Sequence, residues 1–153
     1  MLERITKNQE ETIELGKEIA KKLHGGEVLA LNGDLGAGKT TFVKGIAKGL
    51  GIKQNITSPT FVLMKIYEIK NFPRLELGTR VKFKIKNLVH VDYYRLKSLD
   101  DTLSLGITDY LGKKDTICII EWANKIKFFL PEKTLKIKFK YIDENKRKIQ
   151  LIN

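Results

Sequence analysis

The hydrophobic and polar positions in the first third of the chain predict two helices separated by a strand. Residues 8–26 carry apolar side chains at helical spacing, with Asn8 as N-cap, Glu11 as its capping-box partner and a Gly-Gly pair as the stop. Residues 27–32 form a short, continuously apolar run, typical of a strand covered on both faces. A second helix is predicted over residues 39–50. The inward positions of the two helices are Ile13, Leu15, Ile19, Ala20, Leu23, Phe42, Val43, Ile46, Ala47 and Leu50.

The rest of the chain alternates strands with turns and short helical connections. A strand is predicted from about Phe61, and residues 81–87 pair back with it as a hairpin. Two further strands, in residues 88–96 and 116–122, each end in an acid, and a helical connection broken near Gly106 joins them. The last predicted elements are a short helix over residues 123–131 and an antiparallel hairpin formed by residues 134–142 and 146–152.

This order of elements predicts an α/β fold with a mixed sheet, parallel at its core and with antiparallel hairpins at one side. The 153 residues are enough for one domain, which we expect to span 1–153. No apolar run approaches the roughly 20 residues that a membrane helix needs, and no secretory signal is visible. A single cysteine, Cys118, lies in an apolar run and is expected to be a small buried hydrophobe. These features favour the cytoplasm and argue against a membrane partner.

The charge of the chain changes this picture only in part. The formal net charge is +11 and the sequence pI is near 9.7, which is compatible with a nucleic-acid partner. Many of the lysines, however, alternate strictly with apolar residues in 81–86 and 135–141. Such faces are typical of solvated strands that are protected against edge-to-edge pairing. Lysine ladders without arginine or stacking aromatics are poor readers of bases, so the solvated-face interpretation is favoured while the other stays open.

Candidate chemistry begins in Gly33–Thr40, whose sequence GDLGAGKT satisfies the phosphate-loop pattern G-x-x-x-x-G-K-[ST]. Glycines with positive φ let successive amide N–H groups point into one concavity, and a helix N-terminus adds positive potential there. Lys39 would supply a cation for the β- and γ-phosphates, and the Thr40 hydroxyl would bind Mg²⁺. The motif follows an apolar strand and opens a helix, as this mechanism requires.

Two acids at strand ends are predicted to complete the site, since a phosphate-loop fold delivers its carboxylates there. Glu121 follows the more uniformly apolar strand, so that strand is expected to be central and Glu121 is assigned to Mg²⁺, directly or through a water. Asp92 would share the metal shell or orient the attacking water. His90 faces the same side as Asp92 by alternation and is expected to be a packed, hydrogen-bonded histidine. Trp122 is expected to serve packing or to form a wall of the nucleotide site.

Taken in order, the segments GDLGAGKTTF, TSPTF, HVDYYRL, LGITDYL and IIEW resemble the TsaE (YjeE-type) family of bacterial ATPases, and the resemblance covers nearly the whole chain. It implies a small cytoplasmic ATPase needed to form threonylcarbamoyladenosine in tRNA, with ATP or ADP and Mg²⁺ bound. It also implies work with the TsaD–TsaB pair, which transfers the threonylcarbamoyl group. ATP turnover is expected to be weak alone and stimulated by partner proteins.

The resemblance assigns roles residue by residue. Lys39, Asp92 and Glu121 would be catalytic, Thr40, Asp92 and Glu121 would hold the metal, and residues 57–60 would form a switch-like loop. Gln9 and Arg147 fall where the family contacts the nucleoside. The nucleotide contacts implied are therefore Gln9, Asp34, Leu35, Gly36, Ala37, Gly38, Lys39, Thr40, Thr41, Thr60 and Arg147. Two features depart from the family pattern: the connection from Phe61 to Leu88 is longer, and Lys65 stands where a glutamate is usual.

Two other functions fit parts of the sequence. A small-molecule kinase shares the phosphate loop but usually adds a lid with several arginines, and arginine is sparse here. A basic RNA-binding module, ordered by its nucleotide, would bind tRNA directly with a steep salt dependence. Phosphate transfer to a metabolite would favour the first, and tRNA binding without partners would favour the second.

Overall fold

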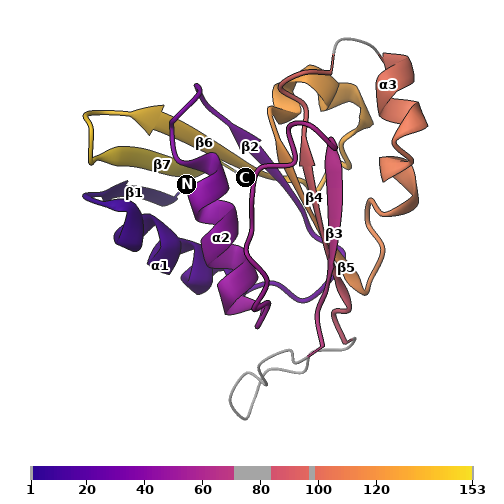
Figure 1. Cartoon of the computed structure of the whole chain (residues 1–153), viewed down its shortest axis with the longest axis horizontal. Helices are drawn as coiled ribbons and strands as arrows, with labels where there is room; N and C mark the ends of the chain where they lie inside the picture. The colour runs from indigo at the N-terminus through magenta and orange to yellow at the C-terminus, as the bar shows by residue number, and fades with distance from the viewer. Residues whose placement is uncertain (1, 71–83, 97–98, 153) are drawn as a thin grey trace.

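The computed structural model describes residues 2–70, 84–96 and 99–152, and within these residues one seven-stranded sheet runs through the molecule (Figure 1). Its strand order is β1-β7-β6-β2-β5-β4-β3. The strands are β1 (Leu2–Thr6), β2 (Val28–Asn32), β3 (Met64–Glu68), β4 (Asn87–Asp92), β5 (Thr116–Glu121), β6 (Leu135–Tyr141) and β7 (Arg147–Ile152).

The centre of the sheet is parallel and its edges are antiparallel. Strands β6, β2, β5 and β4 pair in parallel, which confirms the predicted parallel core. Antiparallel pairs flank this core at both edges, β6–β7–β1 on one side and β4–β3 on the other. The prediction of antiparallel hairpins at one side is therefore too narrow. Strand β5 lies nearer the middle than β4, as the more apolar run before Glu121 predicted.

Helices cover both faces of the central strands. The helices α1 (Gln9–Ala20) and α2 (Lys39–Gly49) pack side by side on one face, where they meet the side chains of Leu29 and Leu31 (Figure 1). On the other face Val28 and Ala30 pack with residues of two 3₁₀ segments, η1 (Ile107–Asp109) and η2 (Ala123–Phe129). A short helix, α3 (Leu99–Ser104), precedes η1, and the predicted break lies between them at Gly106. Among the described residues no helix is both long and apolar enough to cross a membrane.

The first helix starts where the sequence predicted and ends earlier. The Asn8 side chain accepts a hydrogen bond from the Glu11 N–H at 2.7 Å, as an N-cap should. The Glu11 carboxylate accepts from the N–H of Lys7 at 2.8 Å, one residue before the N-cap amide of a regular capping box. The helix ends at Ala20, and tight turns then carry the chain to Leu23. The predicted end at Gly25-Gly26 is therefore five residues late.

Strand boundaries differ from the prediction in three places. Strand β1 was not predicted at all, because its LERIT sequence has four exposed positions and pairs only with β7. Strand β3 begins at Met64 rather than Phe61, whose side chain is exposed. The hairpin predicted over residues 81–87 lies in part outside the described residues; in the described part, the strand that pairs with β3 starts at Asn87. Along β6 the lysines are exposed as predicted, but Tyr141 is exposed instead of facing inward.

The crossing of α1 and α2 depends on two glycines that bring the helix backbones together. A Cβ on Gly45 would collide with the carbonyl oxygen of Ile13, and a Cβ on Gly16 would lie 2.6 Å from the carbonyl oxygen of Phe42. No flexible side chain stands at either contact, so a methyl group requires the helices to separate.

Gly45→Ala is therefore expected to lower the free energy of unfolding by about 1–3 kcal/mol, despite the better helix propensity of alanine. Urea denaturation measures the change. Lys48→Ala, at an exposed position of the same helix, is the control and should leave the midpoint near that of the wild type. An unchanged midpoint for Gly45→Ala would contradict the close helix approach.

Candidate functional site

The loop between β2 and α2 lies at the carboxyl ends of the parallel strands. Gly33, Gly36 and Gly38 have φ values of 152°, 74° and 95°, so each uses the backbone freedom for which the motif needs glycine. Gly38 is the N-cap of α2. Asp92 and Glu121, the last residues of β4 and β5, are register partners in adjacent strands. The topology therefore brings the loop and both predicted acids together.

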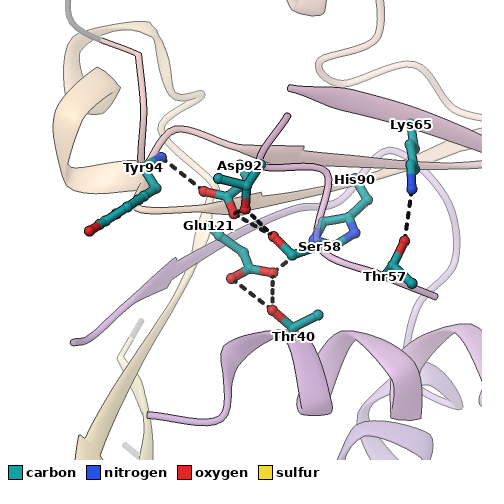
Figure 2. Close-up of polar contacts among 9 residues, drawn as sticks. Thr40, Thr57, Ser58, Lys65, His90, Asp92, Tyr94 and Glu121 are labelled. Carbon is teal, nitrogen blue, oxygen red and sulfur yellow. Dashed lines mark hydrogen bonds and ion pairs between the residues drawn. The ribbon is translucent and has the colours of Figure 1, made fainter. Parts of the chain in front are cut away.

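Glu121 is almost fully buried, with 3% exposure, and two side chains contact its carboxylate. The Thr40 hydroxyl donates to its Oε1 at 2.9 Å and lies 3.3 Å from Oε2. The Nε2 atom of His90 lies 2.9 Å from Oε1 (Figure 2). The residue that the sequence assigned to Mg²⁺ thus lies against the hydroxyl that it assigned to the same ion.

Asp92 links the segment at residues 57–60 to the end of β4. Its Oδ2 accepts hydrogen bonds from the hydroxyls of Ser58, at 2.6 Å, and Thr60, at 2.8 Å. Its Oδ1 accepts from the N–H of Tyr94 at 2.8 Å (Figure 2). A change in the hydrogen bonds of this carboxylate would be transmitted directly to the loop, which is the connection that a phosphate-sensing segment needs.

Lys39 is folded back onto its own loop. Its Nζ donates to the carbonyl oxygens of Gly33, at 2.7 Å, and Asp34, at 2.8 Å, and lies 4.3 Å from the centre of the Trp122 ring. Burial lowers the pKa of Lys39, and the nearby carboxylates of Glu121, Asp92 and Asp34 oppose that shift. The ammonium group therefore lies inside the loop, close to both strand-end acids.

These side chains surround a cavity of about 440 Å³. Its walls come from the phosphate loop, the strand ends and residues 58–61, and Trp122 forms part of one side. The residues that line it are Leu35, Gly36, Gly38, Lys39, Thr40, Thr41, Ser58, Thr60, Phe61, Asp92, Tyr94, Arg95, Glu121 and Trp122.

A second cavity, of about 250 Å³, also borders the glycine loop, and Gly36, Gly38 and Thr41 line both cavities. Gln9 from the start of α1 and Arg147 from the start of β7 meet here, so the structure brings these two predicted residues together. The Arg147 Nε donates to the carbonyl oxygen of Gly36 at 3.2 Å. The remaining lining residues are Asn8, Thr12, Glu144 and Asn145.

Three of the predicted loop residues contribute to the site in different ways. Leu35 is 73% exposed at the edge of the first cavity. The Ala37 methyl group is fully buried in the core, so this residue offers the site only its backbone. Asp34 lines neither of the two cavities among the described residues, and it contributes its carbonyl oxygen to Lys39.

Some residues of the two cavities were not predicted. Tyr94 and Arg95 lie two and three residues after Asp92, and their place close behind a strand-end acid is a signal that could have identified them. Glu144 and Asn145 lie in the turn between β6 and β7, which reads as an ordinary polar turn. Nothing local in the sequence indicates that this turn reaches the phosphate loop.

The oxygen donors present suit Mg²⁺. Thr40 and Glu121 place a hydroxyl and a carboxylate 2.9 Å apart at the cavity wall, and Asp92 lines the same cavity. The described residues contain no cluster of three His, Cys, Asp or Glu side chains that could hold a metal by themselves. Magnesium is usually bound by one or two carboxylates together with substrate phosphates, so these residues fit it in the presence of a nucleotide.

Comparison with known proteins agrees with this geometry. Residues 6–149 match the family model described as "Threonylcarbamoyl adenosine biosynthesis protein TsaE". The TsaE proteins of Bacillus subtilis and Treponema pallidum are 39% and 36% identical to the chain; the matches cover 94% and 95% of it, and 80% and 96% of those proteins. The crystal structure of Bacillus subtilis YdiB superposes with a TM-score of 0.70 at 36% identity, covering 98% of this chain and 83% of that one. The predicted family is thus confirmed: the chain belongs to the TsaE family of threonylcarbamoyl adenosine biosynthesis proteins, with the α/β fold of a P-loop nucleotide-binding protein.

Proposed function

We propose that the protein binds and hydrolyses ATP, with Mg²⁺, as a component of the machinery that forms threonylcarbamoyladenosine in tRNA, and that it acts with a TsaD–TsaB pair. The observation that carries the proposal is the convergence of Lys39, Thr40, Asp92 and Glu121 on one cavity. A loop that only bound a nucleotide would not need two further carboxylates at its strand ends. Membership of the TsaE family supports the tRNA-modification role, and that role in turn supports a cytoplasmic location.

The position of each of these side chains suggests its role in the proposed reaction. Lys39 would exchange the carbonyl oxygens of Gly33 and Asp34 for phosphate oxygens, while the loop amides bind the β-phosphate. Thr40 and Glu121 would hold Mg²⁺, which neutralises charge on the phosphates. Asp92 would orient the attacking water, and the loss or gain of its bonds to Ser58 and Thr60 would couple hydrolysis to the loop.

The second cavity is proposed to take the nucleoside. It adjoins the phosphate cavity through Gly36, Gly38 and Thr41, as the two halves of one nucleotide require. Gln9 supplies an amide, and Arg147 supplies a guanidinium that already contacts the Gly36 carbonyl oxygen.

Two exposed apolar side chains at the phosphate cavity support the proposal that a partner protein binds there. Leu35 is 73% exposed and Phe61 is 82% exposed, and both line the cavity. A partner that covers them would exclude water from the site and strengthen its electrostatic interactions. Slow turnover by the isolated protein is therefore expected.

The proposal is tested by calorimetry with MgATP and MgADP, followed by ATP turnover with and without a TsaD–TsaB pair and tRNA. We expect nucleotide binding by the protein alone, slow hydrolysis, and a several-fold increase when the partners are added. Absence of nucleotide binding would overturn the proposal. Faster phosphate transfer to a metabolite than to water would instead indicate a kinase, and salt-dependent tRNA binding without partners would indicate an RNA-binding module.

A further inference from the structure

His90 is fully buried in the middle of β4, and it contacts Glu121 without a role in the proposed reaction. Its Nε2 lies 2.9 Å from Oε1 of Glu121. Its Nδ1 has no hydrogen-bond partner among the residues that the structure describes. Buried polar groups normally have hydrogen-bond partners. A histidine with 0% exposure and only one hydrogen-bonded ring nitrogen therefore calls for an explanation.

The other contacts of Glu121 identify the donor. The Thr40 hydroxyl donates to Oε1 of the same carboxylate. As a ligand of Mg²⁺, Glu121 would be a carboxylate, which can only accept. The proton in the His90–Glu121 bond must then belong to Nε2. His90 is therefore a hydrogen-bond donor to Glu121, and its Nδ1 need not donate to any group.

The two residues stand on different sides of the cavity wall. Glu121 lines the cavity, whereas His90 is not among its lining residues, so His90 contacts Glu121 from outside the cavity lining. His90 and Thr40 both contact Oε1, and among the residues that the structure describes the second oxygen, Oε2, has only the longer contact of 3.3 Å with Thr40. That oxygen keeps lone pairs for a metal ion or for a water bound to it.

We propose that His90 is a positioning residue: its Nε2–H donates to Oε1 of Glu121 and fixes the carboxylate for the Mg²⁺ shell. This inference rests on the proposed role of Glu121. A glutamate side chain has several rotamers, and groups that orient a metal-binding carboxylate reduce the number it can adopt. Figure 2 shows the arrangement, with Glu121 between the ring of His90 and the hydroxyl of Thr40.

A pair of substitutions separates positioning from packing. His90→Leu fills the buried position with an apolar side chain and removes the donor. His90→Gln can place an amide N–H close to the position of Nε2 and keeps it. If His90 only packed, leucine would serve at least as well as glutamine in a fully buried site. Val89→Ala, which changes a buried residue on the opposite face of the same strand, is the control for general loosening of β4.

The main measurement is the Mg²⁺ affinity of the ADP complex by calorimetry. We expect His90→Leu to weaken it by about 10- to 100-fold, as is typical for groups behind a metal ligand. We expect His90→Gln to retain most of the affinity and Val89→Ala to leave it near the wild-type value. ADP affinity in EDTA should stay the same in all variants, because the phosphate loop is untouched.

A second measurement needs no metal and no variant. The ¹⁵N chemical shifts of the His90 ring in the nucleotide-free protein should show a protonated Nε2. A bare Nε2 would overturn the proposal, and so would equal Mg²⁺ affinities for the leucine and glutamine variants. If His90→Leu does not fold, the NMR shifts and His90→Gln still decide. Failure of the wild-type protein to bind nucleotide would instead remove the proposed function and leave the His90–Glu121 hydrogen bond intact.

Discussion

Lys39→Ala is expected to reduce the affinity for ATP and ADP on the order of 10³-fold, which amounts to loss of binding at ordinary protein concentrations. The ammonium group lies within the glycine loop, 2.7 and 2.8 Å from two backbone carbonyl oxygens that a phosphate would replace. Its removal takes away the side-chain cation that we assign to the phosphates and leaves the loop amides, the helix N-terminus and Mg²⁺. The sequence contains a single tryptophan, Trp122, and it lies 4.3 Å from Lys39, so its fluorescence gives a direct readout of binding.

The matched control is Lys48→Ala, which removes an exposed lysine from the same helix and should bind nucleotide like the wild type. The nucleotide-free Lys39→Ala protein should still unfold cooperatively, which shows that lost affinity is not lost folding. Burial lowers the pKa of Lys39, so the charged group opposes folding below that pKa, and its removal acts against the loss of its two hydrogen bonds. Retained affinity in Lys39→Ala would contradict the assignment of this loop to phosphate.

Glu121→Gln should separate binding from hydrolysis. The substitution keeps the size of the side chain but removes the charge that we assign to Mg²⁺, while Lys39 and the loop amides remain. We expect ATP affinity within a few-fold of the wild-type value and turnover at least about 100-fold slower, the usual cost of losing one preorganised electrostatic group. Calorimetry measures the first quantity, and phosphate release with the partner proteins present measures the second.

Two comparisons make this result specific. Glu132→Gln changes an exposed acid and should leave turnover unchanged. Asp92→Asn should also slow turnover, but it additionally weakens the hydrogen bonds to Ser58 and Thr60, so it should alter the protection of residues 57–60 in hydrogen exchange. Equal hydrolysis by wild type and Glu121→Gln would remove Glu121 from the reaction.

The sequence predicted those elements whose burial pattern and end signals lie within the element itself. The phosphate loop, α2 and the apolar strands before Asp92 and Glu121 each carry their signal within about ten residues, because burial of both faces and helix start signals are written locally. Strand β1 carries no such signal. It is an edge strand whose Leu2 and Ile5 are exposed, and only its pairing with β7 makes it a strand.

The residues of the site likewise divide into those predicted from a local motif and those that depend on strand pairing. Lys39 and Thr40 follow from a motif, and the closeness of Asp92 to Glu121 follows from parallel strand order. The meeting of Gln9 with Arg147 rested on the family resemblance alone, because it depends on the pairing of β1 with β7, and the sequence pattern did not predict β1. Alternation placed His90 on the right face, but its contact with Glu121 requires the pairing of β4 with β5.

The unpredicted edge strand, β1, links two of the elements that form the walls of the second cavity. Thr6, the last residue of β1, hydrogen-bonds Thr12 of α1 at 2.8 Å, and its hydroxyl lies 3.5 Å from the carbonyl oxygen of Arg147. The first and last strands of the chain thus meet beside the two residues proposed to contact the nucleoside. Opening of this edge and occupancy of the cavity are then linked equilibria, because local unfolding of β1 would separate the walls of the cavity. The outer edge of the sheet thereby becomes a reporter of nucleotide binding.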